Sequence, residues 1–97
     1  MIQLRFRYLT LVLGAVLGCT SIPTQEMSDA RQAVQAAREA NAGELAPEPM
    51  ENAEALLNKA KQALDAGAYE QAREEALAAR REAIKARGEA LKSAPAP

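Results

Sequence analysis

The residue whose type and position predict the most definite chemistry is the single cysteine, Cys19. It directly follows an apolar run that ends at Gly18, and the chain has no histidine that could share a metal ion with it. A free thiol in an oxidising compartment is normally paired, metal-bound or covalently modified. We expect Cys19 to be modified, and an intermolecular disulfide or a redox thiol remains as an alternative.

Residue types that carry out catalysis are missing or poorly placed. The sequence has no histidine, no glycine-rich phosphate loop and no serine with a base beside it. Its carboxylates fall on the solvated faces of thin predicted helices, away from the apolar surroundings that acid–base catalysis requires. We therefore expect no enzymatic activity, no metal site and no cofactor.

The composition limits the chain to one small helical domain. The chain has 97 residues, of which 48% are hydrophobic and only 3% aromatic. Much of the hydrophobic content is alanine, which favours helix strongly but buries little area per residue. The 12 basic and 13 acidic residues give a formal net charge of -1. This balance argues against a nucleic-acid-binding protein, because such proteins present a basic face and often stacking aromatics.

Residues 1–18 have the features of a secretory signal peptide. Arg5 and Arg7 give a basic start, and an uncharged apolar segment follows. This segment is too short for a transmembrane helix, which needs about 20 apolar residues. The alternative is a buried N-terminal helix, but the sequence turns polar immediately after Cys19. We therefore predict that the chain is exported.

The residues Val16-Leu17-Gly18-Cys19 resemble the lipobox of bacterial lipoproteins. The resemblance implies cleavage between Gly18 and Cys19, a diacylglyceryl thioether on the sulfur and an acyl group on the new amino terminus. Each buried methylene contributes about 0.8 kcal/mol, so several acyl chains make a durable anchor. Such lipoproteins use Asp after the cysteine as an inner-membrane retention signal. Thr20 at that position therefore implies sorting to the periplasmic face of the outer membrane.

Three helices are predicted after the signal peptide. Ser28 is a suitable N-cap for the first helix, and Gly43 follows its end. Pro47 and Pro49 can both occupy the first turn of a second helix, which Gly67 ends. The predicted segments are a lipidated tether at 19–27, helices at about 28–42, 47–66 and 68–92, and a disordered tail at 93–97.

The third predicted helix has a regular heptad pattern. Its a and d positions hold Tyr69 and a series of alanines, with Glu at g and Arg at e. The short break at Gly67 predicts that the second and third helices are antiparallel neighbours, with large residues opposite alanines. The charged positions are Glu75, Glu82 and Glu89 at g, and Arg73, Arg80 and Arg87 at e.

Leu77, Ile84 and Leu91 form a second apolar line outside the alanine seam. We expect the first helix to cover this line and complete a three-helix bundle. Alternatively, the line stays open as a docking face for a partner protein or a second copy. A further alternative is parallel self-assembly of the third helix, in which Glu at g pairs with Arg at e of another chain.

The arginines at e positions, Arg73, Arg80 and Arg87, have two interpretations. They could bind an anionic envelope polymer, such as lipopolysaccharide or peptidoglycan. Alternatively, their stems cover the alanine seam while their charged ends pair with Glu on neighbouring helices. We expect the second arrangement, because Glu accompanies Arg nearly everywhere in the sequence and no net basic patch results.

The segment from about Ser28 to Lys92 resembles the Gram-negative lipoprotein domain known as domain of unknown function 4398. It shares an Ala-rich first helix, an "APE" turn at Ala46-Pro47-Glu48 and a "G-x-Y-x-x-A" turn from Gly67 to Ala72. The resemblance implies a fold and an envelope location without implying a biochemical activity. We predict an all-α, Ala-rich antiparallel hairpin or small three-helix bundle, anchored by lipid on Cys19 and acting as a structural or adaptor module for an unknown envelope protein.

Overall fold

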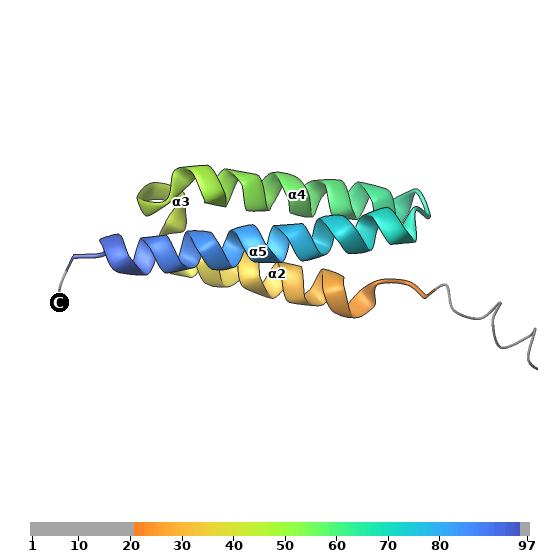
Figure 1. Ribbon diagram of the computed structural model, residues 1–97, viewed down its shortest axis with the longest axis horizontal. Coiled ribbons are helices and arrows are strands. Elements are labelled where there is room, and N and C mark those ends of the chain that lie inside the picture. Colours follow the sequence, from red (N-terminus) through yellow and green to blue (C-terminus); the bar gives the residue numbers. More distant parts are fainter. Residues whose placement is uncertain (1–20, 96–97) are drawn as a thin grey trace, which may run out of the picture.

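The computed structural model describes residues 21–95, which form an all-α bundle (Figure 1). Three long helices run along its length: α2 (Thr24–Glu39), α4 (Pro47–Asp65) and α5 (Tyr69–Ser93). A single turn, α3 (Ala42–Leu45), links α2 to α4. The all-α prediction is confirmed, and the bundle, not the two-helix hairpin, is the architecture that forms.

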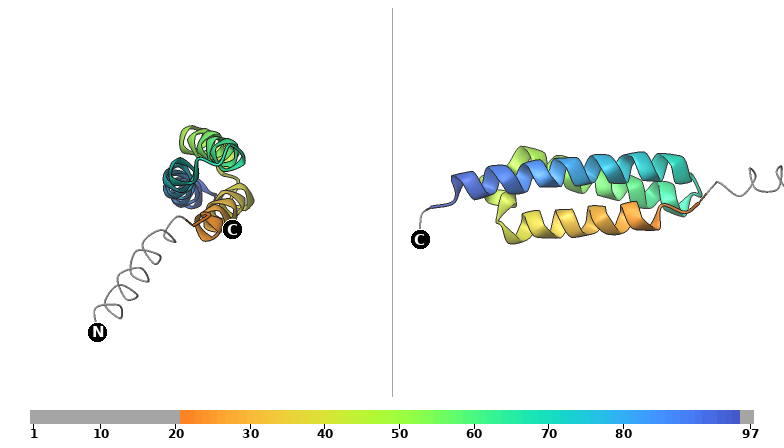
Figure 2. Two further views of the ribbon diagram at one scale, coloured as in Figure 1. Left: turned by 90° about the vertical axis from the view of Figure 1, so that its right-hand side faces the viewer. Right: turned by 60° about the horizontal axis from the view of Figure 1, so that its bottom comes forward.

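The three long helices pack with α5 in contact with both others. α2 and α5 run in the same direction, while α4 runs antiparallel to them (Figures 1 and 2). Seen end-on in Figure 2, the helices stand at the corners of a triangle. Within residues 21–95, no helix combines the length and apolarity needed to cross a membrane.

Helix α2 begins at Thr24, which is earlier than the predicted N-cap at Ser28. Pro23 takes the N-cap position, and its carbonyl oxygen accepts a hydrogen bond from the Met27 amide at 3.0 Å. Pro23 and Met27 are both fully buried in the bundle. Their packing extends the helix by one turn, because tertiary burial outweighs the local preference of Ser28 for a cap. The predicted tether at 19–27 is therefore partly helical.

The end of α2 also differs from the prediction. Asn41, not Gly43, adopts the left-handed conformation, with φ of 63°. The Asn41 amide donates to the Arg38 carbonyl oxygen at 2.9 Å, which closes the last turn of α2. Asn tolerates this conformation better than other residues that have a Cβ. Gly43 lies one residue into α3, and Ala42 beside it is fully buried.

We expect Asn41→Ala to destabilise the bundle by about 1 kcal/mol, since alanine is strained at positive φ. Asn41→Gly is expected to be neutral or slightly stabilising, because glycine adopts this conformation without strain. Urea unfolding followed by circular dichroism measures both effects. If alanine were tolerated as well as glycine, the left-handed turn between α2 and α3 would be incorrect.

The reversal between α4 and α5 follows the prediction closely. Gly67 has φ of 77°, and its amide donates to the Leu64 carbonyl oxygen at 3.0 Å. The Ala68 amide donates to the Ala63 carbonyl oxygen at 2.8 Å. This pair of bonds is the Schellman arrangement that ends helices at glycine. It reverses the chain within three residues, so α5 returns along α4.

The core consists of small side chains on α5 and larger ones on the other two helices. The a and d alanines of α5 are each 0% exposed, whereas Tyr69 at the first of these positions is only half-buried. The larger side chains of the core are Met27 and Val34 from α2 and Met50 and Leu57 from α4. The alanine seam is formed by Ala72, Ala76, Ala79, Ala83, Ala86 and Ala90.

Candidate docking face on α5

The predicted cleavage and lipidation positions, Gly18 and Cys19, lie outside the described residues. The described chain begins at Ser21, which is held against the start of α5. Its carbonyl oxygen accepts a hydrogen bond from Arg73 Nη2 at 3.0 Å.

Arg73 is engaged within the chain. Its guanidinium lies 2.8 Å from Glu70 Oε2 and 3.6 Å from Glu26 Oε1 on α2, in addition to its bond to Ser21. These contacts connect the first turn of α2 to the first turn of α5. Of the three arginines considered for polymer binding, only Arg80 and Arg87 are exposed. The pairing of Arg73 with Glu residues follows our expectation for the e positions.

The predicted apolar line on α5 remains exposed, although α2 packs against this helix. Leu77 is 38% exposed, and Ile84 and Leu91 are each 55% exposed. Each of these residues directly follows a buried alanine of the seam, and consecutive residues are turned by about 100° around a helix. Because α2 packs onto the seam itself, it does not reach over the line. The expectation that the first helix would cover these side chains is therefore wrong.

A shallow hollow borders the line where the last turn of α2 meets α5. It has a volume of about 240 Å³ and is lined by Ala36, Glu39 and Ala40 of α2 with Arg87 and Leu91 of α5. Ala36 and Ala40 are half-buried. Their small side chains leave room beside Leu91, and Glu39 and Arg87 add charged groups to the same hollow.

Five exposed cations lie beside the apolar line between Arg80 and Lys92, whereas Glu75, Glu82 and Glu89 follow another side of the helix. Glu74, which is also exposed, lies one turn before Leu77. One carboxylate oxygen of Glu82 is buried, and Glu75 lines a hollow against α4. Glu89 continues their seven-residue spacing. The exposed side of α5 is therefore more basic than the sequence suggested. The name α5 outer face is used below for Leu77, Ile84 and Leu91 together with the cations Arg80, Arg81, Lys85, Arg87 and Lys92.

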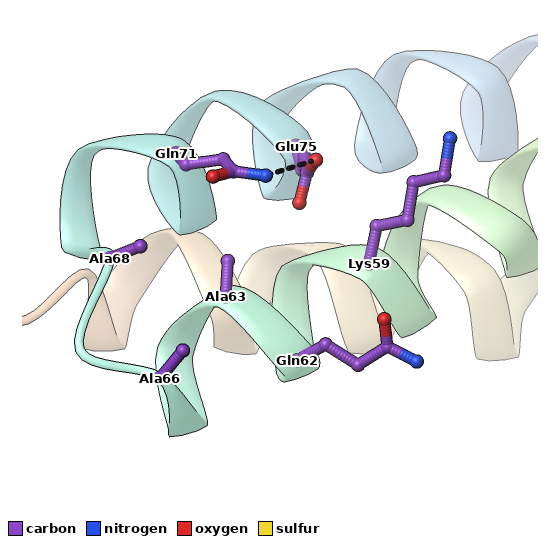
Figure 3. Close-up of a pocket in the computed structure, with 7 residues that line it drawn as sticks. All are labelled: Lys59, Gln62, Ala63, Ala66, Ala68, Gln71 and Glu75. Atoms are coloured by element: carbon purple, nitrogen blue, oxygen red, sulfur yellow. Dashed lines mark hydrogen bonds between the residues drawn. The ribbon is translucent and has the colours of Figure 1, made fainter.

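The larger hollow of the bundle lies between α4 and α5, beside the reversal at Gly67 (Figure 3). It is an open depression of about 480 Å³ with a floor of alanines. Gln71 Nε2 donates to Glu75 Oε1 at 3.2 Å, and Lys59 stands at its edge. No cluster of three potential metal-ligating side chains occurs among residues 21–95. A lysine and one carboxylate line this solvent-open depression, which lacks the enclosed apolar surroundings typical of a ligand site.

Two features around the outer face were not predicted from the sequence. Ile22 is 55% exposed just ahead of α2, and Glu26 of α2 forms an ion pair with Arg73 of α5. The long-range pair depends on the offset between α2 and α5, which no local pattern sets. The basic character of the outer face could have been predicted from the sequence by projecting the helix onto a wheel. Arg80 and Arg81 lie three or four residues from Leu77 and Ile84 and so share their face, whereas Glu82 is not at such a spacing.

Comparison with known proteins gives one match. The family model described as "Domain of unknown function (DUF4398)" matches residues 25–94, which span all four helices. No curated protein and no solved structure matches the chain.

Proposed function

Because this chain belongs to the DUF4398 family, whose model matches residues 25–94, we propose that it is a lipid-anchored adaptor of the cell envelope. The bundle is held at the periplasmic face of the outer membrane by a lipid on Cys19. It presents the α5 outer face to another envelope protein. No catalytic step is assigned to it.

The observation that supports an adaptor is the open aliphatic line on an otherwise well-packed bundle. Within residues 21–95, the buried hydrophobic side chains are mostly alanines, whereas three of the four large aliphatics that are exposed in this part of the chain lie on the outer face. Scattered exposed aliphatics are common on protein surfaces. Three placed at intervals of seven residues lie along the same side of one helix, about 10 Å apart, and such an aligned set suits a surface that packs against another helix.

The packing of the seam bears on the self-assembly alternative. The parallel coiled coil considered from the sequence uses the alanine a and d positions of the third helix. In the bundle these alanines are 0% exposed and are covered by α2 and α4. Such an assembly would require the bundle to open, which favours the adaptor.

Binding of an anionic envelope polymer is a second candidate, because Arg80 and Arg87 are exposed. Peptidoglycan and lipopolysaccharide would be held through charge alone. The two functions differ in their dependence on Ile84. Ile84→Ser should weaken an adaptor contact and leave polymer binding unchanged, as measured by pull-down with either polymer at two salt concentrations.

Photo-crosslinking in intact cells tests the adaptor function. A photoreactive amino acid at Ile84 is expected to give a discrete adduct with another envelope protein. The matched control is Asn58, which is exposed on α4 away from the outer face, and it should give no such adduct. A chain without Cys19 should lose the Ile84 adduct, since it is no longer held at the membrane. Identical patterns from Ile84 and Asn58 would contradict the proposal.

A further inference from the structure

The spacing of the outer face matches one straight helix. Leu77 to Leu91 covers 14 residue steps, about 21 Å along the axis, which corresponds to four turns of a partner helix. The apolar stripe has one aliphatic residue every second turn, with Arg80 and Arg87 between successive aliphatics. It is therefore narrower than the broad apolar face of helices that lie on membranes.

The charges along the stripe specify the partner further. Arg80 and Arg87 lie along one edge of the line, three or four residues from its aliphatics, and Arg81 lies on the other edge. Lys85 and Lys92 extend that second edge. Between Arg80 and Lys92, a helix seated on the stripe would therefore meet cations on both sides, while Glu74 before Leu77 and Glu39 of α2 beside Leu91 are the neighbouring carboxylates. Acidic residues at the e and g positions of the partner would complement these cations.

A second copy in parallel does not fit these charges. In a parallel pair through the same line, Arg80 of one copy would face Lys85 of the other. Arg87 would likewise face Lys92. Like charges across such a seam oppose pairing.

An antiparallel second copy fits no better. With Ile84 at the centre of the pair, Leu77 would lie opposite Leu91, which satisfies the apolar stripe. Arg80 of one copy would then lie opposite Arg87 of the other along the shared edge, again placing cation against cation. Within residues 21–95, Ile22 is the only large exposed aliphatic outside the line, so no other described surface of the chain provides an acidic apolar stripe for the outer face.

We propose that the α5 outer face binds an acidic amphipathic helix of another protein, laid along Leu77, Ile84 and Leu91 so that a fourth helix joins the bundle. This inference rests on the proposed adaptor function and names the chemistry of its partner. The partner helix has apolar residues at a and d, and Glu or Asp at e and g. The hollow beside Ala36, Ala40 and Leu91 receives one of its larger side chains.

Designed peptides and a chain of residues 20–97 test the proposal. All described core residues lie between Pro23 and Ala90, so this chain retains the complete core of the bundle. One peptide of about four heptads has Leu at a and d and Glu at e and g. A second has the same leucines with Lys at e and g. Vesicles of phosphatidylglycerol and phosphatidylcholine serve as an anionic lipid probe.

The acidic peptide is expected to bind, more weakly at high salt, and the basic peptide is not. Ile84→Glu should weaken binding at least about tenfold, as expected for a central interface residue. Asn58→Glu, with the same added charge outside the face, should bind like the unmodified chain. The double variant Arg80→Glu, Arg87→Glu should bind the acidic peptide at least about tenfold more weakly, because one of the two cationic edges is reversed. Circular dichroism checks that each variant stays folded.

Three results would overturn the proposal. The first is equal binding of the acidic and basic peptides. The second is vesicle binding that Ile84→Glu abolishes while neither peptide binds, which would identify a lipid-facing surface. The third is a dimer by sedimentation that Ile84→Glu dissociates, which would identify a second copy. These measurements use a chain without lipid. Failure of the acidic peptide to bind would therefore leave the membrane anchor and the cellular crosslink of the proposed function standing. Loss of the anchor or of the crosslink would likewise leave peptide binding standing.

Discussion

Ala83→Leu is expected to destabilise the bundle by about 3 kcal/mol, because it forces three extra carbon atoms into a fully packed seam. Ala83 is 0% exposed and belongs to the core formed by α2, α4 and α5. A domain of this size has a total stability of only several kcal/mol, so the variant should lose a large part of it. Chemical denaturation followed by circular dichroism measures the loss.

The matched control for Ala83→Leu is Ala55→Leu on α4. Ala55 is exposed, so leucine there should change the free energy of unfolding by no more than about 0.5 kcal/mol. If Ala83→Leu unfolded at the same denaturant concentration as Ala55→Leu, the alanine seam would not be the packed centre of the bundle. Because both variants carry the same chemical change, the difference between their free energies of unfolding reports the effect of burial.

Loss of Cys19 is expected to release the protein from the membrane almost completely. The clean form of this experiment replaces residues 1–19 with a signal peptide that lacks a lipobox, so that export continues and the mature chain starts at Thr20. One acyl chain binds a membrane only marginally and several bind firmly, so their removal changes the distribution between fractions completely. Cell fractionation should move the protein from the envelope pellet to the periplasmic extract.

The control for this release is Ile84→Glu with Cys19 intact, which should stay in the envelope pellet. A chain starting at Thr20 that still pelleted with the outer membrane would show that the bundle binds there without lipid. Release of the unmodified protein by a reducing agent would instead indicate an intermolecular disulfide at Cys19. Either result would remove the lipid anchor from the proposed function.

Most of the fold was predictable because it depends on local chemistry. Glycine at position 67 and prolines at 47 and 49 determine the ends of helices by their own backbone preferences. The heptad alanines of α5 identify a buried seam because their spacing places them on one face. These signals lie within a few residues of each other, so the sequence alone reveals them.

The parts that the sequence predicted poorly depend on contacts between distant residues. The start of α2 is set by burial of Pro23 and Met27, which outweighs the capping preference of Ser28. The exposure of Ile84 depends on where α2 packs around the circumference of α5. The packing of all three helices together sets that position, because the alanines of the seam do not determine it on their own. Leu77, Ile84 and Leu91 were recognisable as a line from their spacing, but the expectation that the first helix covers this line was wrong.

The most direct test of the lipid anchor is the intact mass of the protein purified from the envelope of cells that produce it. The expected species starts at Cys19 and carries a diacylglyceryl thioether and an N-acyl group, and mild alkali should remove only its ester-linked chains. A mass that corresponds to a free thiol at Cys19, or to a chain that still begins at Met1, would contradict the anchored adaptor.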